Sequence, residues 1–266
     1  MKAARKSITT IIFIMVITLM LPAWRDFALF SGCRFFQNTA QAQTHNESYP
    51  VEMYNVYPEG EEEIIADPLE PFNRFMFKVN DRLYFWVFKP VGEGYAKVVP
   101  KPARTGVRNA FYNFIFPVRF VNNLLQLKPV QASAEAARFV LNSIFGFAGF
   151  YNFVDEQCTA KLGPYDEDFG QTLGHYGLRP LFYIVWPVLG PSNLRDSIGL
   201  GGDYFLDPTF YLPIPWYAMG GIKTWQQVNA VSLRLGEYEE FLQSAIDPYV
   251  SMRNAFTQYR QNLIKK

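Results

Sequence analysis

Very few residues of this chain have the type and spacing that catalysis requires. The only histidines are His45 and His175, and the only cysteines are Cys33 and Cys158. Nucleophilic catalysis by Ser or Cys needs a histidine nearby, and only His175 lies within the predicted folded domain. Metal catalysis usually needs three protein ligands, and neither an H-E-x-x-H motif nor paired cysteines occur. The sequence therefore predicts a protein without a cofactor that is not an enzyme.

Two short motifs resemble functional sites but have simpler interpretations. Asp166, Glu167 and Asp168 are adjacent carboxylates, which are more typical of a solvated helix start than of a catalytic pair. The glycine-rich stretch 199–202 looks like a phosphate-binding loop, but no strand is predicted before it. We expect a flexible loop there, and we expect His175 to be a packed or helix-capping residue.

The most informative segment is a run of sixteen uncharged residues between Arg138 and Asp155. Six of these residues are aromatic, and Gly146 and Gly149 interrupt the run. A spanning helix needs about 20 apolar residues, and each glycine is about 1 kcal/mol less favourable than alanine inside a helix. Two interpretations stay open: a bent element that enters a membrane part-way or lines a lipid-facing cavity, and a buried core helix followed by a turn.

The composition favours a protein at a membrane. Of the 266 residues, 49% are hydrophobic and 18% are charged, whereas a soluble domain has about 25% charged residues. The chain also has 25 Phe, 16 Tyr and 5 Trp, and aromatic rings with a polar edge favour the membrane–water boundary. No apolar run after residue 30 is long enough to span, so the protein is expected to lie in or on a membrane. With 25 basic and 24 acidic residues, nothing favours nucleic-acid binding.

The N-terminal segment is predicted to be an export signal. Residues 1–7 are basic, and residues 8–24 are uncharged and strongly apolar. The stretch 29–33 resembles a lipobox, so we favour removal of residues 1–32 and acylation of Cys33. Ordinary cleavage after Ala42, at an A-x-A site, is the alternative, and a retained apolar anchor is the third possibility. If Cys33 is modified or removed, Cys158 is left as a lone thiol.

Residues 33–66 are predicted to be an acidic flexible tether, because six glutamates occur between Glu47 and Glu63. The remaining residues, 67–266, are predicted to form a single, mainly α-helical domain. Asp67 is expected to cap its first helix, with Pro68 at the first helical position. Amphipathic spacing extends this helix to about Phe88.

Further helices follow from the same periodicity. Pro90 and Gly92 are expected to end the first helix, and Thr105 to begin another. Residues 132–144 are expected to be helical, and residues 168–174 to form a short capped helix. The segment 181–189 is a second uncharged run broken by a proline, and 191–216 is expected to be mostly loops. One apolar helical face is predicted over 225–245, and Asp247 is expected to cap a final helix.

Six stretches of the chain together resemble the MlaA (VacJ) family of outer-membrane lipoproteins. They run in family order through the predicted domain: Asp67-Pro-Leu-Glu-Pro-Phe-Asn-Arg74, Pro102-Ala-Arg-Thr-Gly106, Phe139-Val-Leu-Asn-Ser-Ile-Phe-Gly146, Asp168-Phe-Gly-Gln-Thr-Leu-Gly-His-Tyr-Gly177, Asn193-Leu-Arg-Asp196 and Asp247-Pro-Tyr-Val-Ser-Met-Arg253. The imperfect lipobox and the long acidic tether depart from the family pattern.

The resemblance implies a fold and a function. Amphipathic helices would form a membrane-embedded ring around an amphipathic channel, in the inner leaflet of the outer membrane on its periplasmic face. Such a protein would remove mislocalised phospholipids from the outer leaflet, hand them to a periplasmic lipid-carrier protein and sit against a trimeric porin. The alternative is a structural or anchoring lipoprotein without lipid-transfer activity.

The resemblance also implies particular residues. Cys33 would carry the lipid anchor. The gating hairpin of the family would fall on residues 143–154, where glycines would supply the bend. The candidate channel and hairpin residues are then Ser143, Phe145, Gly146, Phe147, Gly149 and Phe150.

Overall fold

The computed structural model describes residues 65–158 and 162–265. These residues form helices and one small sheet: α2 (Glu70–Leu83), the π-helix η3 (Tyr84–Phe88), α3 (Lys89–Val98), α4 (Lys101–Phe114), α5 (Phe116–Leu125), α6 (Pro129–Ile144), α7 (Phe153–Gln157), α8 (Phe169–His175), β1 (Tyr183–Trp186), β2 (Gly190–Asn193), α9 (Leu194–Leu206), the 3-10 helix η4 (Pro208–Tyr211), α10 (Trp216–Leu233), α11 (Glu237–Ser244) and α12 (Pro248–Lys265). The prediction of a mainly α fold is confirmed.

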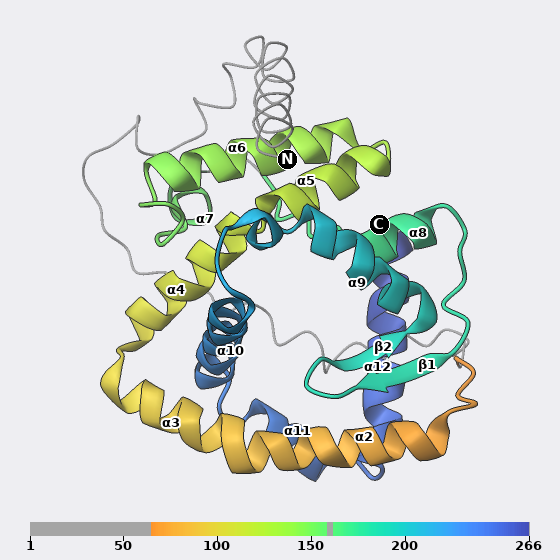
Figure 1. The fold of residues 1–266 in the computed structure, drawn as a ribbon. Helices are drawn as coiled ribbons and strands as arrows, with labels where there is room; N and C mark the ends of the chain where they lie inside the picture. Colours follow the sequence, from red (N-terminus) through yellow and green to blue (C-terminus); the bar gives the residue numbers. More distant parts are fainter. Residues whose placement is uncertain (1–64, 159–161, 266) are drawn as a thin grey trace.

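The helices are arranged as a ring (Figure 1). In that view α2, η3 and α3 form the lower side, α4 rises on the left, α5 and α6 lie across the top, and α8, α9 and α12 form the right side. Helix α10 lies within the ring and packs against α3 and α4, and the β1–β2 hairpin also reaches into it. Within the described ranges, no helix combines the length and the apolarity needed to cross a membrane.

The first side of the ring is one bent helical rod that continues past the predicted end. Pro90 does not terminate it, because the chain widens into the π-helix η3 immediately before, where the amide of Lys89 bonds the carbonyl of Tyr84. Pro90 is then in the first turn of α3, where its missing N–H needs no partner. Gly92 is buried inside α3, against α10. The prediction that these two residues end the helix is therefore wrong.

The start of this rod also differs from the prediction. Helix α2 begins at Glu70, and its N-cap residue, Leu69, makes no side-chain cap. Asp67 is instead a buried carboxylate that accepts hydrogen bonds from Asn73 and from the hydroxyl of Tyr249, and it pairs with Arg253 at 3.3 Å. The capping prediction fails because these distant partners hold the carboxylate away from the helix end. Similarly, α4 begins at Lys101, one turn before the predicted start.

The region predicted to be loops contains a helix of thirteen residues, α9. Its N-cap is Asn193, whose side chain accepts from the amide of Asp196. Its glycines lower helix propensity but allow close packing on α8: a Cβ at Gly199 would lie 2.5 Å from the amide nitrogen of Gly170. The glycine-rich stretch 199–202 is therefore a helix–helix contact and not a loop.

The C-terminal helices agree with the predicted pattern except for one break. Gly236 has φ +98° and separates α10 from α11, so the predicted single face over 225–245 is divided between two helices. Asp247 caps α12 as predicted, because its Oδ1 accepts from the amides of Tyr249 at 3.0 Å and Val250 at 3.2 Å. Within the described chain, the folded part extends back to Ile65, which is 7% exposed and packs with the buried Tyr183.

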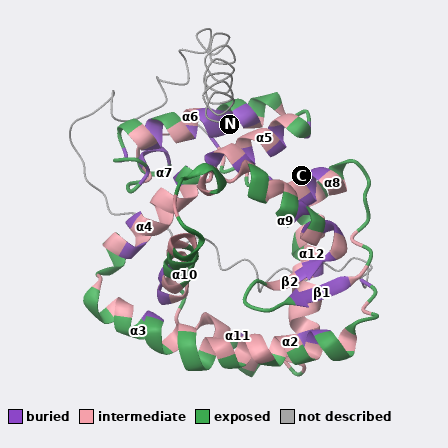
Figure 2. Ribbon diagram, viewed as in Figure 1, coloured by how far each residue is buried: buried purple, intermediate pink, exposed green. Residues whose placement is uncertain are grey.

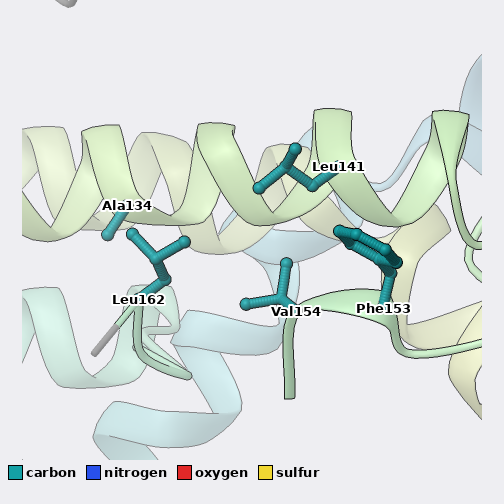
Figure 3. Close-up of a cluster of buried hydrophobic side chains, with 5 residues drawn as sticks. All are labelled: Ala134, Leu141, Phe153, Val154 and Leu162. Atoms are coloured by element: carbon teal, nitrogen blue, oxygen red, sulfur yellow. The ribbon is translucent and has the colours of Figure 1, made fainter. Parts of the chain in front are cut away.

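The interior of this fold is unusually polar. Among the described residues, more polar and charged side chains than hydrophobic ones are buried, while many large apolar side chains are exposed. Figure 2 shows buried and exposed residues alternating along the helices. Small apolar clusters remain, such as the one in which Phe153, Val154 and Leu162 pack under α6 (Figure 3). Charged groups are almost never fully buried unless they are paired, so this fold depends on hydrogen-bonded side chains.

Candidate functional site

The predicted hairpin is a tight chain reversal between α6 and α7. Helix α6 ends at Ile144, residues 145–151 form turns, and α7 begins at Phe153. The amide of Gly149 bonds the carbonyl of Asn142 at 2.9 Å, and the amide of Tyr151 bonds the carbonyl of Gly146 at 2.9 Å. In Figure 1 this turn lies beside α4, on the side of α4 away from α10.

The two glycines have different roles in the turn. Gly149 has φ +88°, a backbone conformation that side chains disfavour. Gly146 has no positive φ, but a Cβ there would overlap the carbonyl oxygens of Tyr151 and Asn142. Phe147 and Ala148 also have positive φ, of 51° and 59°. Such backbone conformations cost about 1–3 kcal/mol each, so the surrounding contacts must fix this turn firmly.

Two polar contacts fix the turn. Arg138 and Asp155, the charges on either side of the uncharged run, form an ion pair at 2.5 Å and a second hydrogen bond at 3.1 Å. Asn113 of α4 donates to the hydroxyl of Ser143 at 2.9 Å. The uncharged run is therefore a closed loop with paired charges at its base.

The aromatic residues of the turn are divided between protein and surface. The ring of Phe150 lies over Gly106 of α4, at a position that any larger side chain would overlap. Phe147 is 83% exposed, and Phe145 and Phe150 are also exposed, whereas Gly146 and Gly149 are buried. The structure thus brings Ser143, Gly149 and the ring of Phe150 against α4 and leaves Phe147 at the surface.

The acidic triplet is only partly solvated. Asp166 is exposed, as predicted. Glu167 is buried and receives hydrogen bonds from Gln126 and Lys128, both at 2.9 Å. Asp168 caps α8, as predicted for a short capped helix, and also binds Arg260 through two hydrogen bonds of 2.6 and 2.9 Å. The prediction of a solvated start is wrong for Glu167 and Asp168, because basic residues distant in the sequence bind these two carboxylates.

Two carboxylates of this region have opposite pKa shifts. Burial raises the pKa of Asp168, but the hydrogen bonds and the charge of Arg260 outweigh it, so the pKa is lowered. For Asp203, burial and the nearby charge of Asp168 raise the pKa to about 6, although hydrogen bonds from Phe169 and Asn122 oppose the shift. The donors to Asp203 are neutral and the charge of Arg260 has only a small effect on it, which explains the different sign.

The second uncharged run forms an antiparallel hairpin, which the sequence did not indicate. Strands β1 and β2 pair from Tyr183–Asn193 to Trp186–Gly190. Asn80 of α2 holds the hairpin tip, donating to the carbonyl of Trp186 at 2.9 Å and accepting from the amide of Val188 at 2.7 Å. The side chain of Asn80 and the apolar side chains of α2, η3, α10 and the hairpin line a cavity of about 170 Å³.

The residues that could have supported catalysis are not assembled into a site. His175 is exposed at the end of α8 rather than packed, and it lies edge-on to Tyr176. No metal-binding cluster of His, Cys, Asp and Glu occurs in the described ranges. Cys158 is half-buried and packs against the apolar cluster that contains Leu141, Phe153 and Leu162. Cys33 itself lies outside the described residues, as do the predicted signal and most of the tether.

Comparison with known proteins decides the family. The model of the MlaA lipoprotein family matches residues 65–263. The chain belongs to the MlaA lipoprotein family. It is 35% identical over 199 residues to the "Intermembrane phospholipid transport system lipoprotein MlaA" of Escherichia coli, covering 73% of this chain and 76% of that protein. It is 33% identical over 206 residues to the protein of the same name from Haemophilus influenzae, covering 73% of this chain and 78% of that relative.

A solved structure of the family shares the fold. It is described as "Structural basis for maintenance of bacterial outer membrane lipid asymmetry", with 30% sequence identity and a TM-score of 0.65. The match covers 75% of this chain and 99% of the solved chain. The family resemblance that the six motifs indicated is therefore confirmed, and so is the mainly helical fold that it implied.

Proposed function

We propose that this protein carries phospholipid in an intermembrane phospholipid transport system that maintains outer-membrane lipid asymmetry. In this role it removes mislocalised phospholipids from the outer leaflet and hands them to a periplasmic carrier. The relatives named above support the assignment, and one observation of this chain carries it. Large apolar side chains are on the outside of the helices, and polar and charged side chains are inside.

This distribution suits a protein that is surrounded by lipid. Water-soluble proteins rarely expose large contiguous apolar patches, and here Trp86, Val98, Phe147 and Trp216 are each more than 70% exposed. Acyl chains would cover such side chains. A phospholipid headgroup must avoid an apolar path, because burying an unpaired charge is very costly. An apolar exterior matches the acyl chains of the surrounding lipid, and we propose that the headgroup follows a polar path through the middle of the ring.

The proposed location is the inner leaflet of the outer membrane, with the domain facing the periplasm. Acylated Cys33 would supply an anchor, and the acidic tether before the domain would let it reach its site. A trimeric porin is the proposed neighbour in the membrane, and a soluble lipid-carrier protein is the proposed acceptor. We propose no catalytic step. A His175→Ala variant is therefore expected to keep outer-leaflet phospholipid at its normal level.

The direct test is outer-leaflet phospholipid in a strain that lacks this protein. Its level should rise on deletion and return to normal when the gene is restored. An unchanged level would instead support the alternative, a structural or anchoring lipoprotein without lipid-transfer activity. The same assay tests the predicted hairpin: bulky replacements of Gly149 should impair lipid removal in a protein that still folds, and normal removal would exclude a hairpin role.

A further inference from the structure

A second cavity lies between the C-terminal end of α8, the segment 177–180, the end of β2 and the last turns of α12. We call it the α8–α12 cavity. Its volume is about 210 Å³, and part of its wall is apolar, formed by Ile65, Leu178, Pro180 and Ile264. Pockets for whole drug-sized ligands measure about 300–1,000 Å³, so this one suits a headgroup-sized ligand.

The rest of the wall is polar and includes four basic side chains, one of which is buried. Arg195 is 4% exposed. Its Nε and Nη2 both bond Oδ1 of Asp196 at 2.8 Å. A Cβ at Gly174 would lie 3.0 Å from its Nη1, so the glycine leaves room for the guanidinium. A guanidinium in the wall of a cavity presents N–H donors that suit an anion.

The other charges around the cavity leave an excess of positive charge. Arg260 is already committed, with bonds of 2.6 and 2.9 Å to Asp168 and of 2.7 Å to Asp196. Arg179 and Lys265 also line the cavity, and both residues are exposed. The carboxylates of Asp168 and Asp196 are bound by Arg260 and Arg195, so the wall carries two further cations that a ligand can reach.

We propose that the α8–α12 cavity binds the phosphate of a glycerophospholipid, with the glycerol end of the lipid against the apolar wall. This proposal rests on the proposed function, because it names a headgroup site for the transported lipid. Guanidinium groups suit phosphate since they present several N–H donors in one plane. Free phosphate shares the anionic chemistry but would gain nothing from Ile65, Leu178 and their apolar neighbours.

The test uses charge reversal at the two exposed cations of the cavity wall, Arg179 and Lys265. Binding of dioctanoyl phosphatidylglycerol to the detergent-purified mature protein is compared in the wild type and in the double variant Arg179→Glu/Lys265→Glu. The variant should bind at least about tenfold more weakly, which is what losing a hydrogen bond to a charged group costs. The matched control is Lys101→Glu/Arg234→Glu, which makes the same charge change at exposed positions outside the cavity wall and should bind like the wild type.

Two further probes identify the ligand. Dioctanoylglycerol, which lacks the phosphate, should not distinguish the wild type from the double variant. Inorganic phosphate should bind much more weakly than the lipid, and equal affinity would overturn the lipid assignment. A third protein, in which residues 43–63 are deleted, lacks the tether glutamates. If lipid binds only after this deletion, the chain's own acidic segment occupies the cavity. That result would also overturn the proposal.

Failure of this proposal can be separated from failure of the proposed function. If the double variant binds the lipid as tightly as the wild type, the α8–α12 cavity is not a headgroup site. The outer-leaflet phospholipid of a deletion strain does not depend on that result, so it tests the transport function independently.

Discussion

Gly146→Ala gives a sharp test of the chain reversal between α6 and α7. The new methyl group would meet the carbonyl oxygens of Asn142 and Tyr151. Both oxygens belong to the backbone, so no flexible side chain can move aside. The carbonyl of Asn142 accepts the amide of Gly149, and the carbonyl of Gly146 accepts the amide of Tyr151. The turn must therefore open and weaken these hydrogen bonds.

The expected size of the effect follows from two opposing terms. Forcing an extra carbon into a packed site costs about 1–3 kcal/mol. Alanine recovers about 0.4–1 kcal/mol because it has less conformational freedom than glycine in the unfolded chain. Gly146 has no positive φ, so no further backbone term enters. A net loss of about 1–2 kcal/mol should lower the melting temperature by roughly 2–8 °C in a domain of this size.

The assay is thermal unfolding of the detergent-purified protein, followed by circular dichroism. Gly220→Ala is the matched control, because Gly220 lies inside α10 and a Cβ there would have nothing within 4 Å. The control should gain up to about 1 kcal/mol from the better helix propensity of alanine. The two substitutions are therefore expected to have opposite signs. A Gly146→Ala variant as stable as Gly220→Ala would refute the geometry of the turn.

Three further predictions concern buried polar groups and the anchor. The pKa of Asp203 in the folded state is raised to about 6, so the free energy of unfolding should fall as pH rises from about 4 to about 6. Asp203→Asn should abolish this fall and raise the free energy of unfolding at pH 7 by as much as about 3 kcal/mol. Denaturant unfolding of both proteins at about pH 4 and at pH 7 measures the difference. Asn73→Ala should cost about 2–4 kcal/mol in the same unfolding assay, because the carbonyl of Tyr183 and the amide of Val185 lose their buried partner; a loss below about 1 kcal/mol would contradict this. Mass spectrometry of the mature N-terminus should find acylated Cys33. A disulfide at Cys33 would reject acylation, because one sulfur cannot carry both modifications. A terminus after Ala42 would also reject it, because Cys33 would then have been removed.

Local signals in the sequence were sufficient for several elements. Asp168 and Asp247 precede helices that they cap, and their partners are amides two or three residues away. Gly146 and Gly149 indicated a bend in the uncharged run, and the chain does turn there, because the positive φ of Gly149 and the close backbone contacts of Gly146 depend on a few neighbouring residues. The six motifs then identified the family, which implied the ring that periodicity alone would not give.

Long-range partners account for what the sequence did not reveal. Asn73 looks like an exposed residue of an amphipathic helix, yet it is fully buried and bonds Tyr183, 110 positions away. Asp67 is similar, because Arg253 and Tyr249 approach it from the other end of the domain. Gly199 was interpreted as a loop residue, since propensity cannot show that α8 would pack against it. Each error has the same cause: a polar or glycine residue whose partner is distant in the sequence.

Quenching of tryptophan fluorescence by brominated acyl chains tests the central claim most directly. The two most exposed tryptophans of the described residues are Trp86, at 74%, and Trp216, at 85%. In lipid bilayers or nanodiscs made with lipids brominated along the acyl chain, both should be strongly quenched, because the account places them among acyl tails. Absence of quenching, in a protein that stays monodisperse in buffer without detergent, would contradict a ring that presents its apolar surface to the membrane.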